Sequence, residues 1–523
     1  MLDHKKRTNS LFAIMLASVA IIPCAANAQS ITLTSNDGSI NIVGDFIDLV
    51  DDYYIINSAL GELRVEAGRV QCNGDACPRV AVAASDVVMV GSGTVGVGLV
   101  PFLIDGFATS QNGVIEDQSQ SGAITTSSLV GEGGFGEPIG TFSVSATASA
   151  DAFSGLRDPA VKIGMSSRRI QPAEARQLRN FGAGNLIDVN QEHVVAVDSI
   201  SVIVHPNNPI GAISLADLDL IYSGAVTNWS EIGGQNAPIK VYTSGRDTGA
   251  ATVFASRVFE QSGRTVSPEA TEITSSEEMA SLVRNDPTAI GYVATAFERG
   301  TKALALEGTC GISSAPTQFD AKTEEYPLQR RLYLYNRADN VDATTQAFID
   351  YSMSGAADEM IAKSGFVNLA ITKVPQDLQN GRMRAVLQDA VDPFEFRLAR
   401  EMLLEMFEWE RLSTTFRFAS GSARLDGKGQ ADLQRLIAYL REQPAGTNIS
   451  VVGFTDGDGA FGPNQELSFG RAQRVADEIL AAGGADLEGI NIQVKGFGEL
   501  SPSACNDSLE GKRINRRVEV WIQ

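Results

Sequence analysis

Histidine is scarce in this sequence, which has three histidines among 523 residues, together with three tryptophans and five cysteines. His4 lies at the N-terminus, so His193 and His205 are the two left for the rest of the chain. With so few histidines, the sequence gives little support for a Ser-His-Asp triad or a His-rich metal centre. Both residues adjoin expected strands, and we interpret them as strand-edge residues. We therefore expect a non-enzyme; a phosphatase, the enzymatic alternative, would need a nucleophile with a base or metal ions.

Positive charge is also in short supply. Lys and Arg number 42 against 63 Asp and Glu, which gives a net charge of −21. Nucleic acid is bound through clustered Lys and Arg, so we exclude it as a partner. The overall field would also repel a small anion. Neutral dipoles and one or two arginines act at short range, however, where the surface charge is screened, so a local anion pocket remains compatible with the acidic composition.

No long apolar run follows the N-terminus, so we expect no transmembrane segment. The first residues are basic, residues 11–22 form a short apolar run, and Ala26-Asn27-Ala28 offers small residues at a cleavage position. This pattern predicts a signal peptide over residues 1–28 and an exported chain that begins at Gln29. Cys24 raises a lipoprotein alternative, although Ile21-Ile22-Pro23 is a poor context for lipid attachment.

Export places the four remaining cysteines in an oxidising compartment, where disulfides are the first interpretation. Cys72 and Cys77 flank a short turn that contains glycine, which predicts a local disulfide. A metal site is disfavoured there because no second Cys pair and no histidine lie nearby. For Cys310 and Cys505 two alternatives stay open: they pair with each other, or each is free.

Hydrophobic patterning divides the mature chain into four parts. Residues 29–84 show short alternating strands and predict a small β module. Residues 85–370 alternate strands and helices, which indicates an α/β domain with largely parallel sheets. Residues 371–412 contain a charged amphipathic run and predict a helical linker. Residues 413–523 return to α/β patterning.

The last 110 residues or so carry an ordered set of motifs. These are Gly453-Phe-Thr-Asp456, Asn464, Leu467-Ser468, Arg471-Ala472, Gly496-Phe-Gly-Glu499, Pro502 and Asn515-Arg-Arg-Val-Glu519. In this order and spacing they resemble the OmpA C-terminal family, which implies an α/β fold that binds the diaminopimelate-containing peptide of peptidoglycan. The resemblance implies that Asp456 takes the ligand's ammonium, that Arg471 takes its carboxylate and that Asn464 supports the loop. An anion and a cation held apart suit a zwitterionic amino-acid end.

A calcium loop beginning at Asp456 is excluded. Ala460 and Phe461 stand where an EF-hand needs an oxygen ligand and a glycine, and Leu467 replaces its bidentate glutamate.

The middle region resembles the phosphate-binding proteins of ABC transporters. The segments that carry the resemblance are Gly91-Ser-Gly-Thr94, residues 163–168, 217–229, 242–254, 290–293, 326–335 and Gly365-Phe366. The resemblance implies a two-lobed α/β periplasmic-binding-protein fold, phosphate or a related oxyanion as ligand, and an ABC permease as a further partner. The motif at Gly91–Gly96 also fits a dinucleotide fingerprint, but no acidic strand end follows it at the required distance.

A tetrahedral anion needs many donors, and hydroxyls and backbone N–H groups at strand-to-helix loops supply them without filling the cleft with charge. Arginine adds a forked cation. The anion-binding candidates are Ser92, Gly93, Thr94, Thr147, Ser149, Ser166, Ser167, Arg168, Arg246, Asp247, Thr248 and Gly249.

Two positions depart from the phosphate-receptor pattern. Ala250 replaces a hydroxyl residue, and Ser167 stands where well-studied phosphate receptors have the aspartate that accepts the proton of HPO4²⁻. A carboxylate acceptor excludes sulfate, so sulfate or a phosphate ester remains open unless Asp247 or Asp151 substitutes.

Taken together, the sequence predicts a periplasmic receptor for phosphate or a related oxyanion that is anchored to peptidoglycan and needs no cofactor. The alternative is a wall-tethered scaffold or adhesion protein whose receptor-like domain has lost ion binding.

Overall fold

The computed structural model describes residues 30–35, 40–50, 53–67, 70–74, 76–77, 85–131, 138–245, 248–376, 386, 393–418, 425 and 427–523. Residues 1–28, expected to be the signal peptide, lie outside this set. The chain divides into two compact units, residues 1–82 and residues 83–523. None of the described helices is long and apolar enough to cross a membrane.

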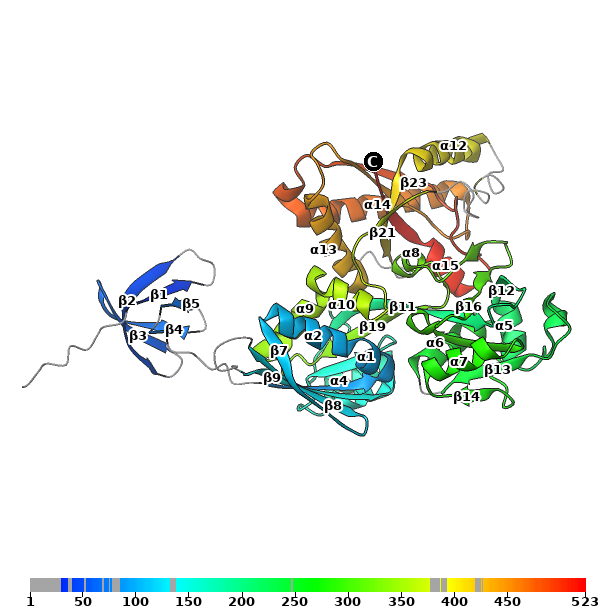
Figure 1. Ribbon diagram of the computed structural model, residues 1–523. Helices are drawn as coiled ribbons and strands as arrows, with labels where there is room; N and C mark the ends of the chain where they lie inside the picture. Colours follow the sequence, from blue (N-terminus) through cyan, green and yellow to red (C-terminus); the bar gives the residue numbers. More distant parts are fainter. Residues whose placement is uncertain are drawn as a thin grey trace, which may run out of the picture. The chain divides into compact units, whose positions relative to one another are not determined.

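The first unit contains an antiparallel sheet in the order β4-β3-β2-β1-β5, drawn in blue (Figure 1). Its strands are β1 Ser30–Ser35, β2 Asn41–Val50, β3 Tyr53–Ser58, β4 Gly61–Glu66 and β5 Val70–Asn73. Alternate residues of β1 and β3 point to one face, where Ile31, Leu33, Tyr54 and Ile56 form a small core. The predicted Cys72–Cys77 disulfide is confirmed and closes the end of β5.

The second unit begins with a mixed sheet of 11 strands, with the path order β14-β13-β15-β11-β19-β10-β6-β9-β8-β7. Its strands are β6 Ser85–Ser92, β7 Gly113–Ser121, β8 Ile124–Gly131, β9 Pro138–Thr147, β10 Ile163–Ser166, β11 Glu192–Val204, β13 Lys240–Ser244, β14 Thr271–Ile273, β15 Ala289–Ala294, β16 Lys302–Ala303 and β19 Gln329–Asn336. The largely parallel sheet that was expected is therefore only partly present. Hairpins join β7, β8 and β9, and β11 runs antiparallel to β15 and β19.

The helices of this region are α1 Gly93–Gly98, α2 Val100–Ser110, α3 Ser149–Gly155, α4 Pro172–Asn180, α5 Leu215–Tyr222, α6 Gly249–Val258, α7 Ser276–Asn285, α8 Gln318–Lys322, α9 Ala343–Met353 and α10 Asp358–Lys363. A small sheet adds β12 Ala212–Ser214, β17 Ala305–Glu307 and β18 Ser313–Ser314.

Strand β11 is shared by two lobes (Figure 1). Its first half pairs with β19 and its second half, from Ile200, pairs with β15. Lobe 1 (residues 85–199 and 329–370) has a core that includes Phe107, Phe142 and Phe348. Lobe 2 (residues 200–310) has its own core around Tyr222, Phe254 and Tyr292. The lobes therefore join where β11 changes its partner from β19 to β15.

The C-terminal domain has the sheet order β20-β21-β24-β22-β23. Its elements are β20 Lys373–Pro375, α12 Pro393–Glu408, β21 Glu410–Arg417, α13 Gly427–Arg441, β22 Asn448–Gly453, α14 Phe461–Gly483, β23 Asn491–Gly496, α15 Leu509–Asn515 and β24 Arg517–Ile522.

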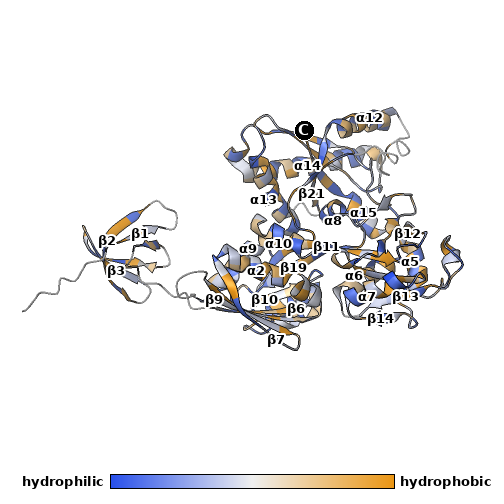
Figure 2. Cartoon of the chain, in the orientation of Figure 1, coloured by the Kyte–Doolittle hydropathy of each residue, from blue (hydrophilic) through white to orange (hydrophobic). Residues whose placement is uncertain are grey.

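The described parts of the segment predicted as a helical linker, residues 371–412, belong to this C-terminal domain. β20 pairs with β21, and α12, striped hydrophobic and hydrophilic, buries Met402 and Met406 against a core that contains Trp521 (Figure 2). Sequence patterning showed the amphipathic helix but not the surface that its apolar side covers.

Buried ion pairs join the C-terminal domain to the receptor-like region. The Glu325 carboxylate accepts hydrogen bonds from Nη1 and Nη2 of Arg411 at 3.0 and 2.7 Å, and from the Ser503 hydroxyl at 2.9 Å. Arg417 donates to the carbonyl of Thr323 at 2.6 Å. These contacts are hidden from water, so residues 83–523 behave as one packed body.

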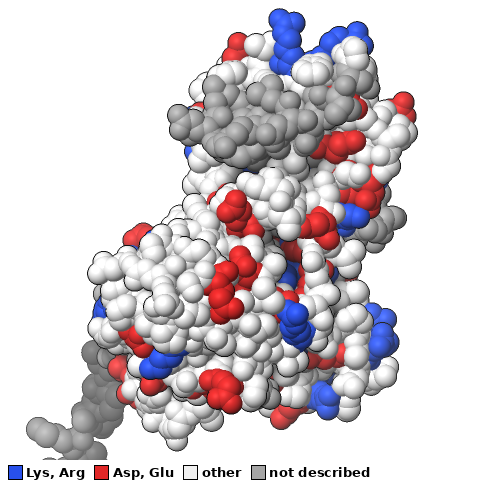
Figure 3. Space-filling model, turned by 90° about the vertical axis from the view of Figure 1, so that its right-hand side faces the viewer, with Lys and Arg blue, Asp and Glu red and all other residues white. Residues whose placement is uncertain are grey.

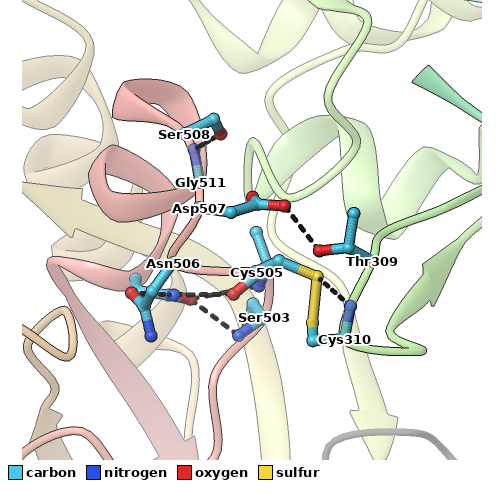
Figure 4. Close-up of a disulfide and its surroundings, with 10 residues drawn as sticks. Thr309, Cys310, Ser503, Cys505, Asn506, Asp507, Ser508 and Gly511 are labelled. Carbon is cyan, nitrogen blue, oxygen red and sulfur yellow. Dashed lines mark hydrogen bonds between the residues drawn. A yellow bond between two sulfur atoms is a disulfide. The ribbon is translucent and has the colours of Figure 1, made fainter. Parts of the chain in front are cut away.

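A disulfide between Cys310 and Cys505 resolves the alternative that the sequence left open (Figure 4). Beside it the Thr309 hydroxyl donates to the Asp507 carboxylate. Cys310 belongs to lobe 2 and Cys505 to the C-terminal domain, so the two domains are linked covalently. On the face shown in Figure 3, acidic side chains are spread over the surface, and Lys and Arg occur singly or in small groups.

Candidate functional site

Three buried serines form a hydrogen-bonded cluster in lobe 1. The Ser167 hydroxyl lies 3.2 Å from Ser92 Oγ and 3.1 Å from Ser149 Oγ, and the Ser167 N–H donates to Ser149 Oγ at 3.1 Å. Ser92 ends β6, Ser149 begins α3 after β9, and Ser167 follows β10. β6 runs parallel to both β9 and β10, so the carboxyl ends of the three strands meet at one edge. The topology therefore brings three predicted residues together.

Lobe 2 reaches this cluster with the first residue of α6. A Cβ atom placed on Gly249 would lie 1.7 Å from Ser167 Oγ, so only glycine permits this approach. Thr248, the N-cap of α6, uses its hydroxyl to accept a hydrogen bond from the Ala251 N–H. The positive end of the α6 dipole therefore faces the serine cluster.

A buried arginine lies beside the same contact. Nε and Nη2 of Arg330 donate to Asp198 Oδ2 at 2.8 and 2.7 Å, and the two side chains are 2% and 1% exposed. Asp198 on β11 and Arg330 on β19 are opposite partners in the ladder. Burial raises the pKa of the Asp198 carboxyl, whereas the charge and hydrogen bonds of Arg330 lower it.

The third guanidinium nitrogen of Arg330, Nη1, does not bond to Asp198. Nη1 is buried and has no hydrogen-bond partner among the described residues. It lies 3.3 Å from the position that a Gly249 Cβ would occupy. An unsatisfied buried donor is costly, which makes this nitrogen a candidate donor to a bound anion.

Sequence reasoning missed Arg330 and Asp198. The available signal was Asp198 within the mostly apolar strand of residues 192–204 and Arg330 near the start of the strand of residues 329–336. Such charges are rarely buried unless they are paired, and here each is the other's partner.

Other predicted residues have different roles in the structure. Ser166 donates its hydroxyl to the carbonyl of Arg168 at 2.7 Å. The Arg168 guanidinium forms a two-pronged ion pair with Glu174 at 2.9 and 2.6 Å, which takes it out of the anion cluster. Thr147 is exposed and donates to the carbonyl of Gly91 at 3.4 Å.

The remaining candidates can be placed only in part. Gly93 and Thr94 begin α1 and are half-buried. Asp151 accepts a hydrogen bond from the Ala148 N–H at the start of its own helix, so it is occupied as a cap. Arg246 and Asp247 lie outside the described residues.

The two histidines lie apart from the serine cluster's hydrogen bonds. His193 Nε2 hydrogen-bonds to Asn336 Oδ1 at 2.7 Å, and burial lowers its pKa. His205 follows β11, and its Nδ1 accepts a hydrogen bond from the Asn207 N–H. Among the described residues, no group of three or more His, Cys, Asp or Glu could hold a metal ion.

A second candidate site lies in the C-terminal domain. Asp456 follows β22, is 9% exposed and forms an ion pair with Arg516 Nη1 at 2.6 Å. Asn464 donates to the Asp458 carbonyl at 3.1 Å and to Glu499 Oε2 at 3.0 Å, so its amide ties the Asp456 loop together.

Arg471 lies on α14, near enough to Asp456 for the two charges to interact. Partial burial and the nearby charge of Arg516 lower its pKa, while Asp456 raises it. Its Nη1 is buried, and no described residue accepts a hydrogen bond from it. An anion and a partly unsatisfied cation thus share one edge of the domain, which suits a zwitterionic ligand.

Comparison with family models assigns the two regions separately. Residues 136–356 match the PBP superfamily domain, and residues 417–516 match the OmpA family. Both resemblances expected from the sequence, and the multidomain fold class, are confirmed.

Individual proteins are similar to one region or the other. The phosphate-binding protein PstS of Bacillus subtilis is 26% identical over 248 residues, which cover 47% of this chain and 76% of that protein. Outer membrane porin F of Pseudomonas aeruginosa is 33% identical over 113 residues, which cover 22% of this chain and 31% of the porin. The crystal structure of an ABC-type phosphate transport receptor from Vibrio cholerae is 22% identical, with a TM-score of 0.41, and covers 54% of this chain and 99% of that one.

Proposed function

We propose that residues 85–370 bind a tetrahedral oxyanion, with phosphate as the leading candidate, in the cleft between the lobes. The observation that carries the proposal is the buried cluster of Ser92, Ser149 and Ser167, which Gly249 meets from the opposite lobe. Hydroxyls and the start of α6 supply neutral donors, the chemistry that a desolvated anion needs. The similarity to the phosphate-binding protein PstS of Bacillus subtilis supports the same ligand class.

We further propose that the C-terminal domain holds the protein on the diaminopimelate-containing peptide of peptidoglycan, in the periplasm. Asp456 is the partner for the peptide's ammonium and Arg471 the partner for its carboxylate, with Asn464 supporting the loop. The ammonium must share Asp456 with Arg516. In this arrangement the protein is a wall-anchored binding protein rather than an enzyme, and an ABC permease is the recipient to test.

Isothermal titration calorimetry on residues 29–523, stripped of bound ions, tests the oxyanion proposal. Phosphate should bind, and Ser167→Ala should lower the affinity roughly tenfold because a donor is lost. Ser166→Ala is the matched control, since that hydroxyl already donates to Arg168. If sulfate binds as tightly as phosphate, the protein is an oxyanion receptor that is not specific for phosphate.

The wall-binding proposal is tested with a muropeptide that ends in diaminopimelate. Asp456→Asn and Arg471→Gln should each weaken its binding, whereas Asp477→Asn should not. Asp477 lies on α14, the helix that carries Arg471, but it is exposed and accepts a hydrogen bond from Gln473 of the same helix. Equal binding by all three variants would contradict the assignment.

A wall-tethered scaffold is the second candidate. It is favoured by the contact of the C-terminal domain with both lobes, through Arg435–Asp358 on lobe 1 and Cys310–Cys505 on lobe 2. Such bridging opposes the hinge motion of a two-lobed receptor. Folded protein that gives no heat with phosphate or sulfate would support the scaffold.

A further inference from the structure

We infer that Arg330 is the cation that contacts the oxyanion, and that Asp198 orients it from the hinge between the lobes. This inference rests on the proposed oxyanion site and deepens it by naming the charged residue that meets the ligand. The sequence motifs did not point to this residue.

The first argument is the unused bonding capacity of Arg330. Two of its nitrogens are held by one carboxylate oxygen of Asp198, and Nη1 is buried with no acceptor among the residues that the structure describes. A buried donor without an acceptor is unfavourable, so Nη1 favours an acceptor that comes from a ligand.

The second argument is the direction of that donor. Nη1 lies beside Gly249, and the same Gly249 approaches the Ser167 hydroxyl. Arg330 therefore faces the one point where donors from lobe 1 and the start of α6 from lobe 2 converge. An anion at this point would receive hydroxyl, backbone and guanidinium donors together.

The third argument is competition from other charges. Arg168 is taken by Glu174, and Arg169 is held by Glu192. Asp198 bonds to Nε and Nη2 of Arg330 but not to Nη1, so Nη1 can still donate to an anion. Within the described part of the cleft, it is the cation best placed for the ligand.

The pair also lies where the lobes join. Asp198 and Arg330 face each other across β11 and β19, two residues before β11 changes its partner from β19 to β15 at Ile200. Both side chains are therefore carried by paired strands at the hinge rather than by a loop. Asp198 acts as a positioning residue, since it fixes the plane of the guanidinium and does not itself meet the anion.

The test measures phosphate and sulfate affinity of residues 29–523 by calorimetry, with thermal unfolding recorded for every variant. Arg330→Gln should raise the Kd for both ions about 10- to 100-fold, the range expected for a lost charge-assisted hydrogen bond. Arg330→Lys keeps the charge and should recover part of the loss. Arg157→Gln is the matched control, because this exposed arginine of lobe 1 bonds to Gln177 and should leave the affinity unchanged.

Arg330→Gln leaves Asp198 buried without its cation, which could impair folding. The double variant Asp198→Asn/Arg330→Gln replaces the ion pair by two neutral amides and removes that difficulty. Weak binding by the folded double variant supports the inference. Binding within twofold of the wild type by that variant would overturn it and leave the oxyanion site standing. A folded wild type that binds neither ion would instead remove the proposed function, and the inference with it.

Discussion

Cys310 and Cys505 are joined by a disulfide although 195 residues separate them in the chain. The bond connects lobe 2 to the C-terminal domain and lies next to the hydrogen bond between Thr309 and Asp507 (Figure 4). It makes the C-terminal domain a fixed part of the packed body of residues 83–523 rather than a module on a tether.

Replacing this disulfide should destabilise residues 83–523. Because the closed loop is long, Cys310→Ala/Cys505→Ala should lower the free energy of unfolding by about 2–5 kcal/mol. All three tryptophans, Trp229, Trp409 and Trp521, lie in this unit, so urea unfolding followed by tryptophan fluorescence reports on it alone. Cys72→Ala/Cys77→Ala is the control and should leave this transition in place. Identical midpoints for the two double variants would contradict the expectation.

Glu325 should be indispensable to the buried interface. Its carboxylate is bonded to Arg411 and lies 3.4 Å from Arg517 Nε. Removing one partner of a buried ion pair leaves uncompensated charge, so Glu325→Gln should lower the free energy of unfolding by about 3–5 kcal/mol. Glu359→Gln, which removes the exposed pair with Lys363, is the control and should produce no measurable change. Equal unfolding midpoints for Glu325→Gln and the wild type would show that this ion-pair network does not contribute to stability.

Gly249 should control the closure of the cleft. Gly249→Ala places a methyl group against Ser167 Oγ, so the lobes must separate and oxyanion affinity should fall about 10- to 100-fold. Gly211→Ala, a glycine of lobe 2 with open space around it, is the control. Adding Ser167→Ala to Gly249→Ala should restore closure, although one hydroxyl donor is then missing. Unchanged affinity in Gly249→Ala, measured by calorimetry, would place the ligand elsewhere.

Lys322 should make stability depend on pH above neutrality. Burial lowers its pKa from 10.5 to about 8, and its Nζ donates to the carbonyl of Ala370. Below pH 8 the lysine is charged in both the folded and unfolded chains, so the folded state carries the full cost of burying the charge. Between pH 8 and pH 10.5 the unfolded chain binds more protons, so this cost is relieved and stability rises with pH, by roughly 3 kcal/mol at most.

Urea unfolding at several pH values between 7 and 10.5 measures this effect as the difference between the wild type and Lys322→Met. The wild type should gain stability relative to the variant as the pH increases. Lys363→Met, at an exposed lysine, should show no such difference. Parallel pH profiles for the wild type and Lys322→Met would rule out the proposed role of Lys322.

Much of the candidate anion site could be predicted from local sequence. Ser92 ends a strand, Ser149 begins a helix and Ser167 directly follows a strand, and the ends of parallel strands meet at one sheet edge. Gly249 was found in the same way. The assignments of Arg168 and Ser166 were less informative, because a sequence shows a side chain's chemistry but not the partner that already occupies it.

The sequence by itself determined the export signal that we predict, the local Cys72–Cys77 disulfide and the order of the domains, since each depends on residues close together in the chain. Only the tertiary structure decided that α12 packs on the C-terminal core, that Cys310 bonds to Cys505, and that Asp198 and Arg330 form the hinge pair. These partners lie up to 195 residues apart. Their meeting depends on strand register and on the burial of whole surfaces, which local spacing does not encode.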